Sequence, residues 1–360
     1  SKDKRVGLPR GMRWNGGPKW ARSHEQTASM HAMVSANGRV FYIIDEGPTE
    51  SIQYPSNFVL TARDAFNGKV LWKKELHHWF NHLYPLKSGP GWMPRRLVAV
   101  GDHVYLSPGI GQNLLKFDAA TGEVLHEYKN TSTTFELIVS DGTVFAAVDS
   151  SRTLPDYCQE DPNCWHERDR ASTKWGWKRE KGDRLLKAMS AEDGEVLWQH
   201  KMPITPMTLS KKGEKVCLYN GNAIVAFDKN SGEKLWETKT SEMNTVRTGY
   251  SGPRLIMKDD YVVFAPKDQL FALSAKNGEI IWSSEDKPRS GHFSLEDVYV
   301  IDEKVWVLGR ANQGRFTTYS LKNGKKLEVY ENPINSFYIH QRCYPGRATE
   351  NFLFPPMMGV

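Results

Sequence analysis

The chain has 360 residues, of which 39% are hydrophobic and 25% are charged, and its formal net charge is +6. No apolar run reaches 18 residues, so the sequence excludes a membrane-spanning helix. Lysine and arginine are scattered without a dense cluster, so nucleic acid is not an expected partner.

A short phrase recurs six times along the chain. Each copy has an alternating strand, a turn with Asn-Gly, Asp-Gly, Ser-Gly or Thr-Gly, and a short strand that often ends in tryptophan. The turn glycines are Gly68, Gly122, Gly194, Gly232, Gly278 and Gly324. Repeats of roughly 40–50 residues rich in short strands are typical of a β-propeller.

Two further strands precede each copy of the phrase. The strand just ahead of it covers residues 39–44, 103–106, 143–148, 215–219, 261–264 and 304–308. An apolar strand lies earlier still, for example at residues 96–100 and 135–139. The sequence therefore predicts an all-β fold, a β-propeller of four-stranded antiparallel blades with the repeated tryptophans packed between blades.

The chain ends suggest a propeller that continues beyond six complete blades. Residues 351–354 and 357–360 are predicted to be the opening strands of a seventh blade, and residues 11–16 the closing outer strand of the last blade. We expect one propeller domain over residues 1–360, with eight blades natively, because an open ring exposes strand edges. A missing C-terminal segment or a second polypeptide would complete the ring; a six-bladed ring is the alternative.

The long connections are predicted to leave from one face, opposite the glycine turns. They cover residues 45–57, 77–94, 149–182, 284–292 and 331–342. Residues 149–182 form an insertion in blade 3 that carries Trp165, Trp175 and Trp177 with Arg168, Arg170 and Arg179, which suits either partner contacts or a self-packed cap.

Ionisable residues precede or begin the innermost strands near that face. We expect ligand binding by Arg95, Arg96, Glu136, Arg254 and His292. A divalent metal could be held by His24, His292 and His340, and the candidate catalytic residues are His24, His340 and Arg342. Structural roles for single histidines stay open, and a second histidine patch comprises His77, His78 and His82.

The four cysteines are separated in the sequence. Cys158 and Cys164 lie in one polar segment, where a disulfide would fit an oxidising compartment, and a zinc site with His166 is an alternative. Cys217 lies in an alternating strand and is predicted to be a small, buried hydrophobic residue. Cys343 begins a short match to the sulfatase modification sequence, in a context without other sulfatase features.

The repeated phrase resembles the PQQ-like repeat of quinoprotein propellers and their relatives. Within that group the chain looks most like large exported PQQ-like propeller proteins of planctomycete-type bacteria. The segments that carry this resemblance are residues 20–25, 41–48, 62–68, 94–101 and 340–344. The resemblance and the candidate disulfide imply a periplasmic or extracellular location, although no signal peptide is visible from Ser1 onward.

The resemblance specifies a fold more than a chemistry. PQQ-type alcohol dehydrogenases carry two adjacent cysteines beneath the cofactor, and this chain has no such pair, so PQQ is not expected. The first hypothesis is an exported propeller that binds a glycan, an anionic small molecule or a protein at the loop-bearing channel mouth. The alternatives are a metal-dependent carbohydrate-active lyase or hydrolase, and a PQQ-dependent dehydrogenase; whether the protein is an enzyme stays open.

Overall fold

The computed structural model describes residues 11–16, 30–50, 57–77, 79, 93–109, 111–149, 184–239, 253–266, 269–284, 297–308, 316–331, 347–348 and 353–354.

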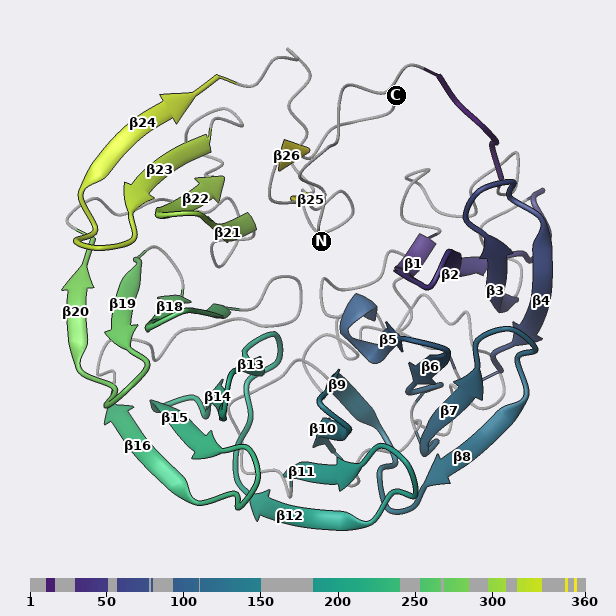
Figure 1. Cartoon of the computed structure of the whole chain (residues 1–360), viewed down its shortest axis with the longest axis horizontal. Helices are drawn as coiled ribbons and strands as arrows, with labels where there is room; N and C mark the ends of the chain where they lie inside the picture. Colours follow the sequence, from purple (N-terminus) through teal and green to yellow (C-terminus); the bar gives the residue numbers. More distant parts are fainter. Residues whose placement is uncertain are drawn as a thin grey trace. The chain divides into compact units, whose positions relative to one another are not determined.

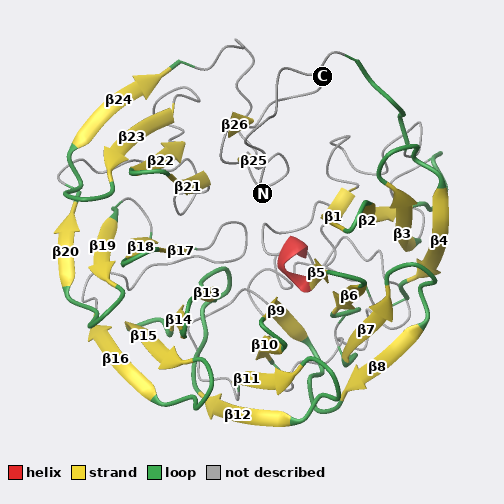
Figure 2. Ribbon diagram, viewed as in Figure 1, coloured by secondary structure: helices red, strands yellow, loops and turns green. Residues whose placement is uncertain are grey.

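Within these residues the fold contains six four-stranded antiparallel sheets, each a simple meander, and one two-stranded sheet (Figures 1 and 2). Blades 1 to 3 are β1 (Met30–Ala36), β2 (Arg39–Asp45), β3 (Phe58–Asp64), β4 (Val70–Glu75); β5 (Leu97–Val100), β6 (His103–Leu106), β7 (Leu114–Asp118), β8 (Val124–Tyr128); β9 (Thr134–Ser140), β10 (Thr143–Val148), β11 (Leu185–Ser190), β12 (Val196–Lys201). Blades 4 to 6 are β13 (Ser210–Lys212), β14 (Lys215–Tyr219), β15 (Ala223–Asp228), β16 (Lys234–Lys239); β17 (Arg254–Lys258), β18 (Tyr261–Ala265), β19 (Phe271–Ser274), β20 (Ile280–Ser283); β21 (Asp297–Ile301), β22 (Lys304–Leu308), β23 (Phe316–Ser320), β24 (Lys326–Tyr330). The predicted four-stranded blades are confirmed.

The chain divides into two compact units, one with blades 1 to 3 and the other with blades 4 to 6. In the first unit β1 contacts β5 and β5 contacts β9, and the short helix η2 (Met93–Arg96) contacts both β1 and β9. In the second unit β17 contacts both β13 and β21. First strands that converge in this way are the arrangement of propeller blades.

Two kinds of turn connect the strands at one end of each blade, which we call the turn end. Asn37 and Gly38 both have positive φ, 43° and 71°, as a two-residue hairpin turn requires. The repeated glycine turn is longer than a two-residue hairpin turn, since Asp64 N donates to the Lys69 carbonyl oxygen at 2.9 Å. Within the glycine turn of blade 1, residues 64–69, only Gly68 has positive φ (74°), and the Asp64 carboxylate accepts hydrogen bonds from the backbone N–H groups of Phe66 and Asn67. The other end of each blade, which carries the β2–β3 type of connection and the links between blades, we call the loop end.

The outer strand of every blade contains a bulge. In blade 1, Ala62 pairs with Trp72 and Arg63 pairs with Val70, which leaves Leu71 without a partner on β3. The other five outer strands shift register at the corresponding place. A bulge twists an edge strand and thereby discourages pairing with another chain.

The outer-strand tryptophans of blades 1, 4 and 5 fasten each of these blades to the next, as predicted; we call the contact between two neighbouring blades a seam. Trp72 Nε1 donates to the Ala119 carbonyl oxygen at 3.1 Å, and Trp282 Nε1 donates to that of Leu321 at 2.8 Å. The indole of Trp72 lies over Gly122, where an added Cβ would come within 2.6 Å of the ring. Glycine is therefore needed in these turns for its positive φ and for the space above it.

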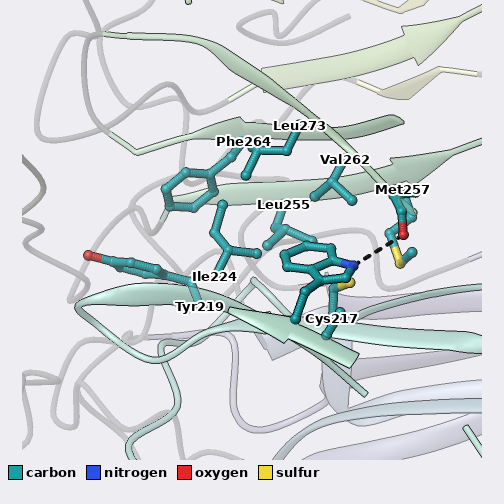
Figure 3. Packing of buried hydrophobic residues seen from close by; sticks show 11 residues of the cluster. Cys217, Tyr219, Ile224, Leu255, Met257, Val262, Phe264 and Leu273 are labelled. Atoms are coloured by element: carbon teal, nitrogen blue, oxygen red, sulfur yellow. Dashed lines mark hydrogen bonds between the residues drawn. The ribbon is translucent and has the colours of Figure 1, made fainter. Parts of the chain in front are cut away.

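The seam between blades 4 and 5 shows how core residues surround the contact between the tryptophan and the glycine turn (Figure 3). Tyr219, Ile224 and Cys217 of blade 4 pack against Leu255 and Phe264 of blade 5. The dashed line in the figure is the bond from Trp236 Nε1 to the Ala275 carbonyl oxygen, 3.2 Å long. Interior packing of this kind is the main source of stability in a repeat fold.

Residues 11–16 supply a tryptophan of the same kind to blade 1. Trp14 Nε1 donates to the Ala65 carbonyl oxygen at 3.0 Å, and its indole lies over Gly68. Trp14 therefore takes the place that an outer-strand tryptophan of a preceding blade would take. That residues 11–16 close the last blade stays a prediction.

One short strand pair follows blade 6. β25 (Arg347–Ala348) pairs with β26 (Leu353–Phe354), which lies within the predicted strand of residues 351–354. Residues 357–360, the other predicted strand, lie outside the described residues. In the part of the chain that is described, no helix is long and apolar enough to cross a membrane.

Candidate functional site

The loop end of blades 2 and 3 gathers charged side chains that the sequence places far apart. Arg95 and Arg96 end η2 immediately before β5, and Glu136 is the third residue of β9. The contact between η2 and β9 brings these predicted ligand-binding residues together within the first unit.

Arg96 is fully buried and is held by its neighbours. Its guanidinium carbon lies 4.0 Å from the centroid of the Trp79 ring, and Nη2 donates to the Ser107 carbonyl oxygen at 3.0 Å. Burial lowers the pKa of Arg96 to about 9. Because Arg96 has no exposed surface, it organises the site rather than touching a ligand. Trp79 is buried too, so this part of the histidine-rich connection belongs to the core.

Arg95 is the exposed member of the group. Its Nη1 lies 3.2 Å from Oε1 of Glu136, and the contact is an ion pair rather than a well-aligned hydrogen bond. The Glu136 side chain is fully buried, whereas that of Arg95 is 37% exposed. A buried carboxylate that holds a partly exposed guanidinium fixes the position of its free N–H groups, which suits recognition of an anionic group.

A second ion pair lies at the two ends of the predicted insertion. Arg184 Nε is 3.3 Å from Asp149 Oδ2, both side chains are more than nine-tenths buried, and Arg184 lies over the Phe135 ring at 5.8 Å. Asp149 follows β10 and Arg184 precedes β11, so the pair joins the two points where the chain leaves and re-enters blade 3. Sequence reasoning missed this pair, although opposite charges that flank a long insertion are a usable signal.

Hydrogen bonds tie the two ion pairs into one site. Ser107 Oγ donates to the Thr134 carbonyl oxygen at 2.6 Å, and Asp149 N donates to the Thr133 carbonyl oxygen at 3.2 Å. We call this group the loop-end charge cluster. Its members are Arg95, Arg96, Glu136, Asp149 and Arg184. They carry one positive charge more than negative, which favours an anionic ligand.

The remaining predicted site residues have other positions. Arg254 begins β17 at the loop end of blade 5, where Nη1 hydrogen-bonds to the thioether sulfur of Met207. Six predicted residues lie outside the described residues: His24, His292, His340, Arg342, Cys158 and Cys164. In the described ranges no three His, Cys, Asp or Glu side chains form a metal-binding group. Cys217 is buried as predicted, and burial raises its thiol pKa to about 12.

Comparison with known proteins agrees with this architecture. The family model described as outer membrane protein assembly factor BamB matches residues 13–155 and 182–336. The structure of BamB from Moraxella catarrhalis is similar, with a TM-score of 0.58 and 14% identity over 91% of this chain and 80% of that chain. The computationally designed protein Ika8 has a TM-score of 0.52 and 13% identity over 95% and 97% of the two chains. No curated protein sequence matches.

The fold and repeats define a PQQ-like-repeat β-propeller. The family match covers most of the chain, so the protein belongs to the BamB-type family of these propellers. The likeness to solved structures at such low identity shows the fold alone.

Proposed function

We propose that this protein is an exported, non-enzymatic propeller that binds an acidic protein partner at the loop end of blades 2 and 3. The family description, an outer membrane assembly factor, favours a protein over a glycan or a small anion as the partner. A carboxylate of that partner would bind the guanidinium of Arg95.

One observation carries this proposal, the pairing of Arg95 with Glu136. Desolvating a carboxylate completely is costly, and a structural ion pair gains little by leaving its cation at the surface. The arrangement instead orients the exposed arginine, with Arg96 fixed beneath it on Trp79.

Copurification with Arg95→Glu tests the proposal. The wild-type chain, Arg95→Glu and Arg39→Glu are expressed at equal levels in the organism of origin, cross-linked mildly and purified, and the copurified proteins are quantified by mass spectrometry. Arg39 is the control because its ion pair with Asp102, 3.0 Å long, lies at the turn end of the same unit.

We expect Arg95→Glu to reduce one acidic copurified protein by about tenfold or more, the effect of losing one charge-assisted contact and adding a repulsive one. Arg39→Glu should leave that protein unchanged. An equal loss in both variants, or a turnover activity that depends on metal and on His24 and His340, would overturn the proposal in favour of a nonspecific contact or an enzyme.

A further inference from the structure

The turn end of blade 1 differs from the other turn ends by an exposed aromatic residue. The third residue of its repeated turn is Phe66, which is 67% exposed. The other five turns have small or polar residues there. These are Ala120, Glu192, Asn230, Lys276 and Lys322. The turn geometry therefore does not require an aromatic side chain at this position.

Arg13 lies against this ring. Its guanidinium carbon is 5.9 Å from the Phe66 ring centroid, and no carboxylate among the described residues pairs with it. Met12, the preceding residue, is 79% exposed. An arginine that stacks on an aromatic ring keeps its N–H groups available for a carboxylate.

The patch formed by Met12, Arg13 and Phe66 is held in place from both sides. Trp14, the next residue, is fixed over Gly68 and hydrogen-bonded to the Ala65 carbonyl oxygen. The Asp64 carboxylate fixes the backbone of Phe66 and Asn67 at 2.8 and 2.9 Å. Little ordering is therefore needed before a partner binds.

We infer that this patch is a second interaction surface, which binds an acidic protein segment with a carboxylate next to an apolar side chain. Arginine, methionine and aromatic residues are enriched where proteins meet. A chain with a net charge of +6 attracts acidic partners and repels a second copy of itself. The patch shares no residue with the loop-end charge cluster.

Site-specific photo-cross-linking tests the inference with a control that the repeat itself provides. A photoreactive amino acid replaces Asn67, beside the patch, or Thr121, the equivalent exposed residue in the turn of blade 2. Each is placed in the full chain in cells of the organism of origin, and the cross-linked peptide is identified by mass spectrometry.

We expect a discrete product from position 67 whose cross-linked peptide contains Asp or Glu, and none from position 121. Arg13→Gln should reduce its yield by about tenfold, as should Phe66→Ala, while Arg39→Gln and Arg95→Glu leave it unchanged. Thermal unfolding of each purified variant should match the wild type, because all of the altered side chains are at least partly exposed.

Three results would overturn the inference: equal products from positions 67 and 121, a yield that Arg13→Gln does not change, or a product that is a dimer of this chain. The absence of any product at position 67 would do so as well.

Discussion

Two neighbouring seams in the first unit make the same contacts with different residues. At the seam between blades 1 and 2, one indole, Trp72, covers Gly122 and donates to the carbonyl of Ala119. At the seam between blades 2 and 3, His126 covers the turn glycine Gly194 instead. There the equivalent carbonyl, that of Ala191, accepts hydrogen bonds from Lys116 Nζ and the Tyr128 hydroxyl, both at 2.9 Å.

The comparison shows which features of a seam the fold requires. Both seams keep a ring over a positive-φ glycine and a donor on the carbonyl that follows the third strand. At the seam between blades 2 and 3, which we call the polar seam, His126, Lys116 and Tyr128 together make the contacts that one tryptophan makes at the other seam. Burial raises the pKa of the Tyr128 hydroxyl at the polar seam. The two seams therefore share the positions of the ring and of the hydrogen-bond donor, whereas the residues that supply them differ.

The largest expected effect is the difference in stability between variants that remove the ring of Trp72 or the ring of His126. Trp72→Ala should lower the free energy of unfolding by about 3–5 kcal/mol, because it removes a buried aromatic ring and leaves a cavity. His126→Ala should cost about 1–2 kcal/mol, since Lys116 and Tyr128 still bridge the seam. Urea unfolding of both variants measures the difference; equal losses would show that His126 is as important as the indole.

The glycine beneath the ring gives the next largest effect. Gly122→Ala should destabilise by about 3 kcal/mol, because the methyl group adds a clash with Trp72 to the strain of positive φ. Gly142→Ala is the matched control, with φ of 73° and no atom within 4 Å of an added Cβ, and should cost about 1 kcal/mol. In thermal unfolding, Gly122→Ala should lower the melting temperature more than Gly142→Ala does. The reverse order would contradict the close packing of Trp72 on Gly122.

A double-mutant cycle addresses the shared carbonyl of the polar seam. Lys116→Met and Tyr128→Phe should each cost about 1 kcal/mol, because the other donor still satisfies Ala191. The double variant should cost at least about 1 kcal/mol more than the sum, because the buried carbonyl then has no donor. Simple additivity in urea unfolding would mean that the two bonds are independent.

The smallest effect is the pH dependence of a second buried lysine at this seam. Lys187 Nζ donates to the Asn130 carbonyl oxygen at 2.8 Å, and burial lowers its pKa. The folded state therefore binds fewer protons than the unfolded state just below pH 10.5, so this residue's contribution to stability rises with pH in that range. Lys187→Met should therefore remove part of the rise in the free energy of unfolding between pH 7 and 10, as urea unfolding at each pH would measure.

The sequence was sufficient for the blades because their signals are local. Alternating strands and the turns at Gly68 and Gly122 depend on residues a few positions apart, so the strand bounds match closely. The sequence also placed Arg95 and Glu136 at one face through the repeat register. It missed the Asp149–Arg184 pair, because that contact forms only when the chain returns after the insertion.

Other residues carried no local signal. The stacking of Trp79 on Arg96 involves an irregular connection without periodicity, and the seam role of Lys116 depends on a carbonyl of the next blade. The strand at residues 353–354 lies within the predicted strand of residues 351–354, whereas its partner β25 carried no signal that the sequence analysis used.

The most direct test of the central claim is photo-cross-linking at the two ends of the first unit. A photoreactive amino acid at Gln112, on the loop end beside Thr133, is compared with one at Glu192, on the turn end of blade 3. The proposed function predicts a protein cross-link from position 112 that disappears in Arg95→Glu and is absent from position 192. A cross-link from position 112 that survives Arg95→Glu, or one from position 192 alone, would contradict it.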